Sequence, residues 1–307
     1  MTYAVEAQGL TKQYKTALAV DNIDIAVPAG CCCGFLGKNG AGKTTTLKML
    51  VGLKRPTAGK ISIMGQQQTF GVQTKVEFGY LPDVPNFYGY MTGAEFLDLS
   101  ARLCNIPSGE RKTRVRDLLR KVGLDKTRTR IAGYSRGMKQ RLGIAQAMIN
   151  NPPVIFMDEP VSALDPIGRR DVVEIIQSMS DTTVIFSTHI LADVENLCDF
   201  ILIIEKGKIL AQDYLVNLKA NHAEGAAKIR FVQPQDAKRF LAHAAEAGHF
   251  SAEEQANPTE LLLHTKTDMQ ELSRAVTAML HTDGLAIEHF GAHIPHLEDI
   301  FYEVIGK

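Results

Sequence analysis

The chain has 307 residues, and its 34 basic and 34 acidic side chains give a formal net charge of zero. This length suits one large domain or two ordinary ones, and the balanced charge provides no general attraction for nucleic acid or another polyanion. The longest apolar runs, 153–157 and 200–204, are far shorter than the roughly 20 residues of a membrane-spanning helix. We therefore expect neither a membrane span nor a nucleic-acid partner.

The N-terminus and the cysteines indicate the compartment. Residues 1–6 include no basic region followed by an apolar core, so we expect no signal peptide. Of the five cysteines, Cys31, Cys32 and Cys33 are adjacent. Neighbours in a strand point to opposite faces, so these three form neither a single metal cage nor a disulfide framework. We predict small apolar residues of a buried strand in a soluble, cytoplasmic protein.

The first predicted elements lie in residues 3–27, which alternate loosely and carry turn signals at Gly9 and at Asp21–Asn22. This pattern predicts an antiparallel strand pair that flanks a core sheet. Tyr14 lies in a polar part of this segment. It could stack on an adenine ring or simply pack on the surface, and its position does not separate the two.

A glycine-rich loop follows the apolar run 31–36 and leads into a predicted helix from Thr44 to Val51. Strand, glycine-rich turn and helix N-terminus together form the context of a phosphate-binding loop. The glycines allow successive N–H groups and the helix dipole to face an anion, while Lys43 reaches the β- and γ-phosphates and Thr44 ligates Mg²⁺. The predicted nucleotide-triphosphate site comprises Gly37, Lys38, Asn39, Gly40, Ala41, Gly42, Lys43, Thr44 and Thr45.

The middle of the chain predicts a helical insert in an α/β core. Strands are expected at 57–65 and 76–82, and apolar residues at helical spacing predict helices at 92–105 and 108–122, the second with a weak cap at Ser108 and a stop at Gly123. Ser135 and Gly137 then precede a helix predicted at 142–149. They form either a second anion site or an ordinary N-cap.

Two carboxylates end the next apolar strand, at 153–160. Opposite a phosphate loop, Asp158 is expected to hold the Mg²⁺ ion and Glu159 to polarise the attacking water. The alternative is that both merely cap the following turn. A parallel strand at 183–188 ends at His189, which there could hydrogen-bond a γ-phosphate oxygen.

Beyond about residue 216, strands expected at 227–232, 260–265 and 285–290 alternate with helices at 234–247, 268–281 and 295–304. This β-α-β-α-β run predicts a small ferredoxin-like α+β unit. Its histidines cluster only at His289, His293 and His296, without a cysteine or carboxylate at metal-ligand spacing, so we expect no metal there. A regulatory role and a dimer-supporting role both stay open.

Taken together, these motifs resemble the nucleotide-binding subunit of ABC transporters. The resemblance covers residues 3 to about 215. It rests on five segments in family order, which are Lys38–Thr45, Tyr134–Gln140, Asp158–Glu159–Pro160, Ser162–Ala163–Leu164–Asp165 and His189. It is strongest with bacterial exporter subunits encoded apart from their membrane partner, and the ending Pro295–Phe301 resembles their tail.

The resemblance implies a P-loop NTPase core sheet with an antiparallel β subdomain. It predicts an ATPase domain at 1–215, with a helical insert at about 84–150, and an accessory domain at 216–307. It also implies a head-to-tail homodimer, or a heterodimer with a similar ATPase, around two ATP molecules with Mg²⁺. Ser135, Arg136 and Gly137 of one copy would face the nucleotide held by the other, and Asp165 would lie at the dimer seam.

Two positions depart from the family pattern. Arg136 replaces the first glycine of the usual Leu-Ser-Gly-Gly-Gln, as a basic residue often does in exporter subunits. Asp83 stands where a glutamine or glutamate is usual, so its shorter side chain is expected to reach Mg²⁺ through water.

The implied function is a motor subunit on the inner face of the cell membrane, which drives export through a separate integral-membrane transport subunit. The loop 83–90 is the expected docking site, through Phe87, Tyr88 and Tyr90, unless these rings pack onto the insert itself. A soluble ABC-type ATPase acting on DNA or the ribosome is the alternative, although neither heptads nor a second phosphate loop are present. A small-molecule kinase is a third, weaker hypothesis.

Overall fold

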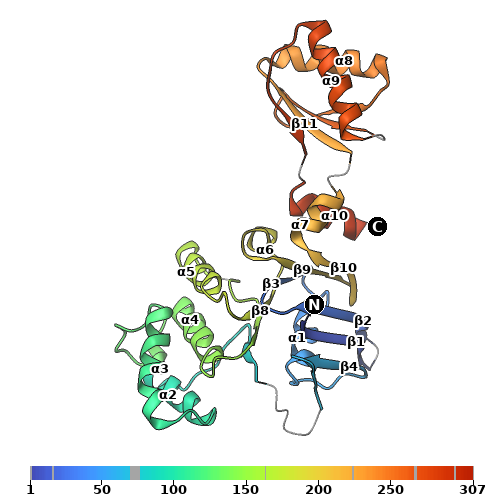
Figure 1. Ribbon diagram of the computed structural model, residues 1–307. Helices are drawn as coiled ribbons and strands as arrows, with labels where there is room; N and C mark the ends of the chain where they lie inside the picture. The colour runs from blue at the N-terminus through green and yellow to red at the C-terminus, as the bar shows by residue number, and fades with distance from the viewer. Residues whose placement is uncertain are drawn as a thin grey trace. The chain divides into compact units, whose positions relative to one another are not determined.

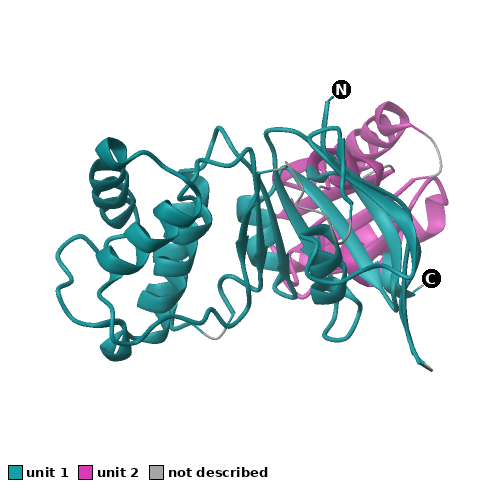
Figure 2. Ribbon diagram, turned by 90° about the horizontal axis from the view of Figure 1, so that it is seen from below, with its two compact units in different colours: residues 1–215, 304–307 teal, residues 216–303 magenta. Residues whose placement is uncertain are grey.

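The computed structural model describes residues 2–15, 17–69, 77–162, 164–222, 225–265, 268–293 and 295–306. It divides into two compact units, one of residues 1–215 with 304–307 and one of residues 216–303, which Figure 2 shows in different colours. Within the described ranges, we find no helix with the length and apolar character that crossing a membrane requires.

An antiparallel sheet begins the first unit, with the strand order β2-β1-β4-β5. It consists of β1 (Tyr3–Tyr14), β2 (Ala17–Pro28), β4 (Ala58–Ile63) and β5 (Gln66–Gln67). The predicted strand pair is confirmed, but its turn was misplaced. Gly9 and Asn22 lie inside β1 and β2, with φ of 60° and 49°, where the pairing register shifts. They mark β-bulges, because a bulge also needs residues that tolerate positive φ.

The core of the first unit is a six-stranded sheet with the order β10-β9-β3-β8-β7-β6. Its strands are β3 (Cys32–Leu36), β6 (Gly79–Leu81), β7 (Val154–Asp158), β8 (Thr183–Thr188), β9 (Phe200–Glu205) and β10 (Lys208–Tyr214). All neighbours pair in parallel except β10 with β9. Every residue of β7 and β8 is buried, as expected for parallel strands covered on both faces. The predicted strand at 76–82 is shorter in the structure, and residue 76 lies outside the described ranges.

The helices of the first unit are α1 (Lys43–Leu50), α2 (Gly93–Leu103), α3 (Ser108–Lys121), α4 (Arg136–Ala147), α5 (Pro166–Gln177) and α6 (Leu191–Leu197), with a 3₁₀ turn at Ile131–Gly133. In Figure 1, α2, α3 and α4 lie together as a helical group beside the sheets. The helix predicted from Leu142 begins earlier, because Ser135 caps it by accepting the Met138 N–H at 3.2 Å. Ser108 is no cap, since it is already the first residue of α3.

The second unit contains β11 (Ala226–Phe231), α8 (Pro234–Ala247), β12 (Ser251–Glu254), β13 (Glu260–His264), α9 (Met269–Asp283) and β14 (Ile287–Ala292). The helices α7 (Leu215–His222) and α10 (Leu297–Gly306) flank them, and the boundary between the units falls within each of these two helices. The sheet order is β12-β13-β11-β14, with antiparallel neighbours. The predicted β-α-β-α-β run missed β12. Including β12, the unit is the β-α-β-β-α-β ferredoxin-like arrangement.

Candidate functional site

The glycine-rich loop joins β3 to α1 and is packed so closely that two of its glycines have no room for a side chain. Gly42 has φ of 114°, and a Cβ there would lie 2.7 Å from the Ala19 carbonyl oxygen. A Cβ on Gly37 would overlap the Ile204 carbonyl. The turn between β9 and β10 also supports the loop, since the Gly207 N–H donates to the Ala41 carbonyl at 2.9 Å. The loop shape is therefore fixed by its neighbours as well as by its own glycines.

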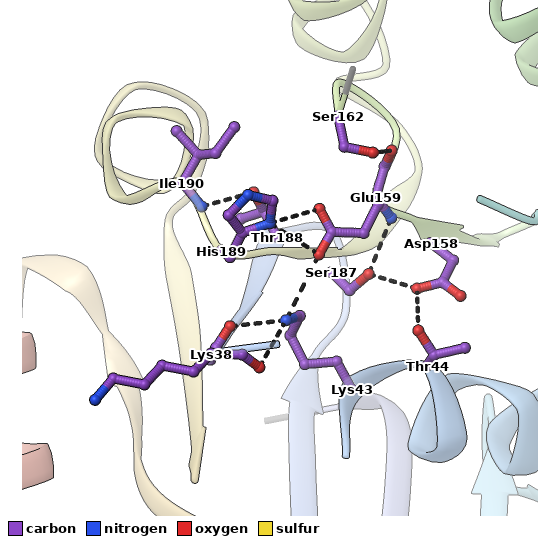
Figure 3. A network of polar contacts seen from close by, with 11 residues as sticks. Lys38, Lys43, Thr44, Asp158, Glu159, Ser162, Ser187, Thr188, His189 and Ile190 are labelled. Carbon is purple, nitrogen blue, oxygen red and sulfur yellow. Dashed lines mark hydrogen bonds and ion pairs between the residues drawn. The ribbon is translucent and has the colours of Figure 1, made fainter. Parts of the chain in front are cut away.

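Lys43 points back across this loop (Figure 3). Its ammonium donates to the carbonyls of Gly37 at 2.7 Å and Lys38 at 3.2 Å, and lies 3.5 Å from Glu159 Oε1. Burial lowers the pKa of Lys43, and the Glu159 carboxylate and then Asp158 oppose that shift. The loop thus holds a cation at the place where phosphate oxygens would bind.

Asp158 ends β7 and is almost completely buried. Its Oδ1 accepts hydrogen bonds from the Ser187 hydroxyl at 2.7 Å and the Thr44 hydroxyl at 3.0 Å. Its Oδ2 is also buried and has no hydrogen-bond partner among the described residues. A buried carboxylate oxygen without a donor, beside a threonine hydroxyl, suits Mg²⁺, which prefers hard oxygen ligands. Thr44 and Asp158 therefore fit the metal that accompanies a nucleotide triphosphate.

Glu159 follows in a left-handed backbone conformation with φ of 49°. Its N–H donates to the Ser187 Oγ at 2.9 Å, which fixes this turn. Its carboxylate lies 3.1 Å and 3.2 Å from the Nδ1 of His189 and also faces Lys43. Strained backbone of this kind is frequent at active sites, where the surrounding structure holds it in place.

Lys43, Thr44, Glu159 and His189 line one cavity of about 380 Å³, and Asp158 and Ser187 lie outside its lining. Its lining residues are Ala19, Asn39, Gly40, Gly42, Lys43, Thr44, Thr45, Asp83, Glu159, Ser162 and His189. The carboxyl ends of parallel strands meet at one edge of a sheet, which explains why His189 after β8 and Glu159 after β7 come together. The sequence pattern indicates no role for Ala19 or Ser187, and it includes Ser162 only as part of a family segment. The Ser187 hydroxyl, which binds both Asp158 and the Glu159 backbone, is the most important of these omissions.

Several predicted site residues lie outside this cavity's lining. The Tyr14 hydroxyl accepts from Lys54 Nζ at 2.6 Å, and the ammonium groups of Lys54 and Lys12 lie 4.8 Å and 5.2 Å from its ring centroid. The Lys54 hydrogen bond is the main reason why the pKa of Tyr14 is lowered, and the Thr45 hydroxyl adds to it. Tyr14 thus lies beside the phosphate loop, but lysines already contact its ring.

Ser135 and Arg136 are exposed at the start of α4 and do not line the cavity of their own chain. Gly137 has room for a Cβ, since the nearest atom would lie 3.9 Å away. Asp165 is also exposed and caps α5, where its Oδ1 accepts the Gly168 N–H at 2.9 Å.

Comparison with known proteins decides the family. Residues 20–162 match the family model described as "ABC transporter". An ABC transporter ATP-binding protein of Bacillus subtilis, YxlF, is 35% identical over 97% of this chain and 98% of its own length. The chain belongs to the ATP-binding proteins of ABC transporters. Its predicted family and fold class are thereby confirmed, and it is an ABC-type ATPase subunit.

Two further relatives are named for the compounds that they handle. The bacitracin transport ATP-binding protein BcrA of Enterococcus faecalis is 32% identical over 100% of this chain and 97% of its own length. The daunorubicin/doxorubicin resistance ATP-binding protein DrrA of Streptomyces peucetius is 32% identical over 99% of this chain and 93% of its own length. This near-complete coverage means that the relationship includes the second unit. The DNA or ribosome alternative is not favoured, and family membership argues equally against the kinase.

Solved structures agree in fold. An ATP-binding subunit of an ABC transporter is 31% identical with a TM-score of 0.65, covering 71% of this chain and 93% of its own. A dimeric bacterial ABC transporter cassette is 23% identical with a TM-score of 0.63, covering 69% of this chain and 98% of its own. At this identity, the likeness supports the fold alone.

Proposed function

We propose that this ABC ATPase subunit drives export through a separate integral-membrane subunit, by closing as a dimer around two ATP molecules and opening after hydrolysis. The observation that carries the proposal is the cavity at the phosphate loop, which Lys43, Glu159 and His189 line together. A cation, a carboxylate and an imidazole in that arrangement match the requirements of phosphoryl transfer to water.

In this proposal, residues 37–45 bind the phosphates through backbone N–H groups, and Lys43 neutralises the β- and γ-phosphate charge. Thr44 and Asp158 would hold Mg²⁺, with Asp83 as a water-mediated partner, and the ion would supply neutralisation of the phosphate charge. Ser187 keeps Asp158 in place by its 2.7 Å hydrogen bond.

Glu159 is the proposed general base, because its carboxylate faces the cavity and is held there by the turn at φ of 49°. It accepts the proton of the attacking water, while His189 Nδ1, 3.1 Å away, fixes its orientation. His189 also lines the cavity, and we assign to its imidazole a hydrogen bond with a γ-phosphate oxygen. Glu159 and His189 are thus the proposed catalytic pair.

The proposed second nucleotide contact comes from another copy. Ser135, Arg136 and Gly137 lie at an exposed helix N-terminus, whose dipole attracts an anion, but they do not line their own chain's cavity. We assign them to the ATP held by the partner, in a homodimer or a heterodimer with a similar ATPase. The Ser135 side chain already caps α4, so that the helix end is formed before any ligand binds.

Export and location are proposed from the relatives. Two proteins that match both units are named for bacitracin transport and for daunorubicin/doxorubicin resistance. We propose the same direction for this chain, with a small antibiotic-like cargo handled by the membrane partner. The ATPase then works at the cytoplasmic face of the membrane. Residues 1–215, with their helical insert at about 84–150, are the proposed motor domain, and 216–307 the accessory domain.

Two substitutions test the chemistry. Lys43→Ala should abolish ATP binding or turnover, because the phosphates lose their flexible cation. Glu159→Gln should keep ATP affinity and lower phosphate release about 100-fold or more, because an amide cannot accept the proton of the attacking water. Nucleotide affinity and phosphate release are measured for both, with the wild type as reference. Near-normal turnover by Glu159→Gln would remove Glu159 from the role of base.

A further inference from the structure

A partly buried ion pair lies outside the cavity, between α5 and α6, with the Asp193 side chain buried and the Arg169 side chain 36% exposed. Asp193, in the first turn of α6, is only 4% exposed. Its Oδ1 accepts hydrogen bonds from both Nε and Nη2 of Arg169 on α5, with the Nε distance at 3.0 Å. Its Oδ2 is buried and has no hydrogen-bond partner in the described part of the chain. Arg169 is therefore the main stabilising partner of this carboxylate.

On the α5 side, the pair is tied to the turn that contains Asp165. The Arg169 N–H donates to the Asp165 carbonyl at 2.9 Å, and the Asp165 carboxylate accepts from Gly168 N–H in the same turn. The Arg169 backbone is thus joined to the turn proposed to lie at the dimer seam, while its guanidinium contacts Asp193.

On the α6 side, the pair is tied to the turn that contains His189. The Asp193 N–H donates to the Ile190 carbonyl at 3.2 Å, and the Ile190 N–H donates to the Thr188 hydroxyl at 3.0 Å. His189 lies between Thr188 and Ile190 in the sequence, and its Nδ1 contacts the Glu159 carboxylate (Figure 3). A movement of the first turn of α6 would therefore displace the imidazole.

Loss of Arg169 would force such a movement. A buried carboxylate left without its cation is destabilising, and turning toward water to relieve that cost shifts the first turn of α6. The helix itself need not unfold, because Val194 is fully buried and packs it against the sheet, where its methyl carbons would lie 2.8 Å and 3.0 Å from a Cβ on Gly34. The expected defect is one of orientation, with folding retained.

We propose that Arg169 and Asp193 are positioning residues for ATP hydrolysis, which hold His189 against Glu159 and link that contact to the Asp165 turn. The inference rests on the proposed function, because it assigns to His189 and Glu159 the roles described above. Neither Arg169 nor Asp193 lines the cavity, so the pair acts on turnover through His189 and leaves ATP binding to the phosphate loop.

The test compares steady-state ATP hydrolysis of Asp193→Asn, Arg169→Gln and the double variant with that of Arg170→Ala. Arg170 is the matched control, since it is the next residue and its side chain is 80% exposed in an i,i+4 pair with Glu174. We expect kcat of each single variant to fall about 10-fold or more, with KM for ATP within about twofold, as for loss of an interaction that acts on the chemical step. The double variant should lose no more than the worse single variant, because one contact is removed in all three.

Two further measurements separate positioning from scaffold damage. Asp193→Glu keeps the charge and should recover part of kcat, and ATP affinity should stay at the wild-type value in all variants. Turnover equal to that of Arg170→Ala would overturn the inference, and so would a joint loss of ATP affinity and kcat. If Asp193→Asn fails to fold, Arg169→Gln decides by the same criteria. A failure of the proposed function would be seen in a different experiment, as normal ATP turnover by the Glu159→Gln variant.

Discussion

Glu159 combines three constraints in one residue. Its backbone is left-handed, its N–H is held by Ser187, and its carboxylate is shared between Lys43 at 3.5 Å and His189 at 3.1 Å. A non-glycine residue with positive φ is uncommon, and the cost of such backbone is of the order of 1–3 kcal/mol. The hydrogen bond from Glu159 N–H to Ser187 helps to offset that cost. The strained turn aims the carboxylate into the cavity.

Glu260, in the second unit, gives a prediction on pH dependence. It is buried in β13, next to Lys228 and Arg230 of β11, and these cations lower its pKa, with the Lys228 hydrogen bond as the larger cause. A lowered folded-state pKa means that the carboxylate stabilises the fold above its unfolded pKa, and that this stability is lost as pH falls through the folded value.

Glu260→Gln should therefore lower the free energy of unfolding at pH 7 by about 1 kcal/mol, a modest value because both cations are partly exposed to water. The difference between variant and wild type should shrink as pH falls below the ordinary glutamate range. Denaturant unfolding at a series of pH values measures this. The exposed neighbour pair of Glu253 with His264, 3.9 Å apart, provides the control, since Glu253→Gln should have little effect. Equal losses at neutral and acid pH would contradict the prediction.

The role of Ser187 could not be predicted from the residues next to it in the sequence. The phosphate loop could be predicted because all its parts are adjacent in the chain. Ser187, by contrast, is a small polar residue near the end of an apolar strand, and nothing nearby marks it as functional. Its role arises from the parallel register that places Ser187 opposite Asp158. Such a pairing joins residues far apart in the sequence, and only the folded sheet shows it.

At the scale of elements, strongly apolar segments were predictable and weakly patterned ones were not. The strand at 183–188 and the helix at 234–247 have the bounds expected from sequence. The strand β12 was missed because its sequence, Ser-Ala-Glu-Glu, is polar and mostly exposed at a sheet edge. Gly9 and Asn22 were assigned to a turn because the same residue types serve bulges and turns, and pairing alone distinguishes the two.

The loop before α2 carries the prediction on docking to the membrane partner. Phe87 packs edge-to-face on Phe96 of α2 at 5.0 Å, so this ring belongs to the helical group. Tyr88 and Tyr90 are 53% and 65% exposed, with ring centroids 5.9 Å apart. Exposed aromatic side chains are frequent anchors at interfaces. The docking role expected for these three rings is therefore retained as a proposal for the two tyrosines only.

Tyr88→Ala with Tyr90→Ala should reduce recovery of the subunit with membranes about 10-fold when the membrane partner is co-expressed, because two aromatic anchors are lost. Soluble ATPase activity should stay within about twofold of wild type, since neither ring lines the nucleotide cavity. Phe87→Ala is the matched control and should lower thermal stability instead. Unchanged membrane recovery of the double variant would place the docking site elsewhere.

At the scale of the whole molecule, the nucleotide cavity and the Ser135 turn are separate surfaces of one chain. The cavity is lined by the phosphate loop and the strand ends, whereas Ser135 lies at the exposed start of α4. The proposed head-to-tail dimer would bring one surface of each kind together at both nucleotides. The dimer should therefore depend on ATP, and it should persist when hydrolysis is blocked.

Glu159→Gln with ATP and Mg²⁺ should accordingly sediment as a dimer, and as a monomer without nucleotide. Adding Ser135→Arg should restore the monomer by filling the contact, but it also removes the cap to Met138, at a cost of about 1 kcal/mol. Ser135→Asp avoids this ambiguity. Aspartate caps a helix as well as serine does, but its charge repels the phosphates of the partner's ATP. It should fold like the parent and still fail to dimerise.

Ser108→Asp is the matched control for that experiment, because Ser108 is exposed at the start of α3 and makes no capping hydrogen bond there. This variant should dimerise with ATP as the parent does. Sedimentation velocity with and without ATP, at several protein concentrations, distinguishes the outcomes. A dimer that forms without nucleotide, or one that Ser135→Asp leaves intact, would mean that copies associate through another surface, such as the second unit. The Ser135 segment would then act only as the cap of α4.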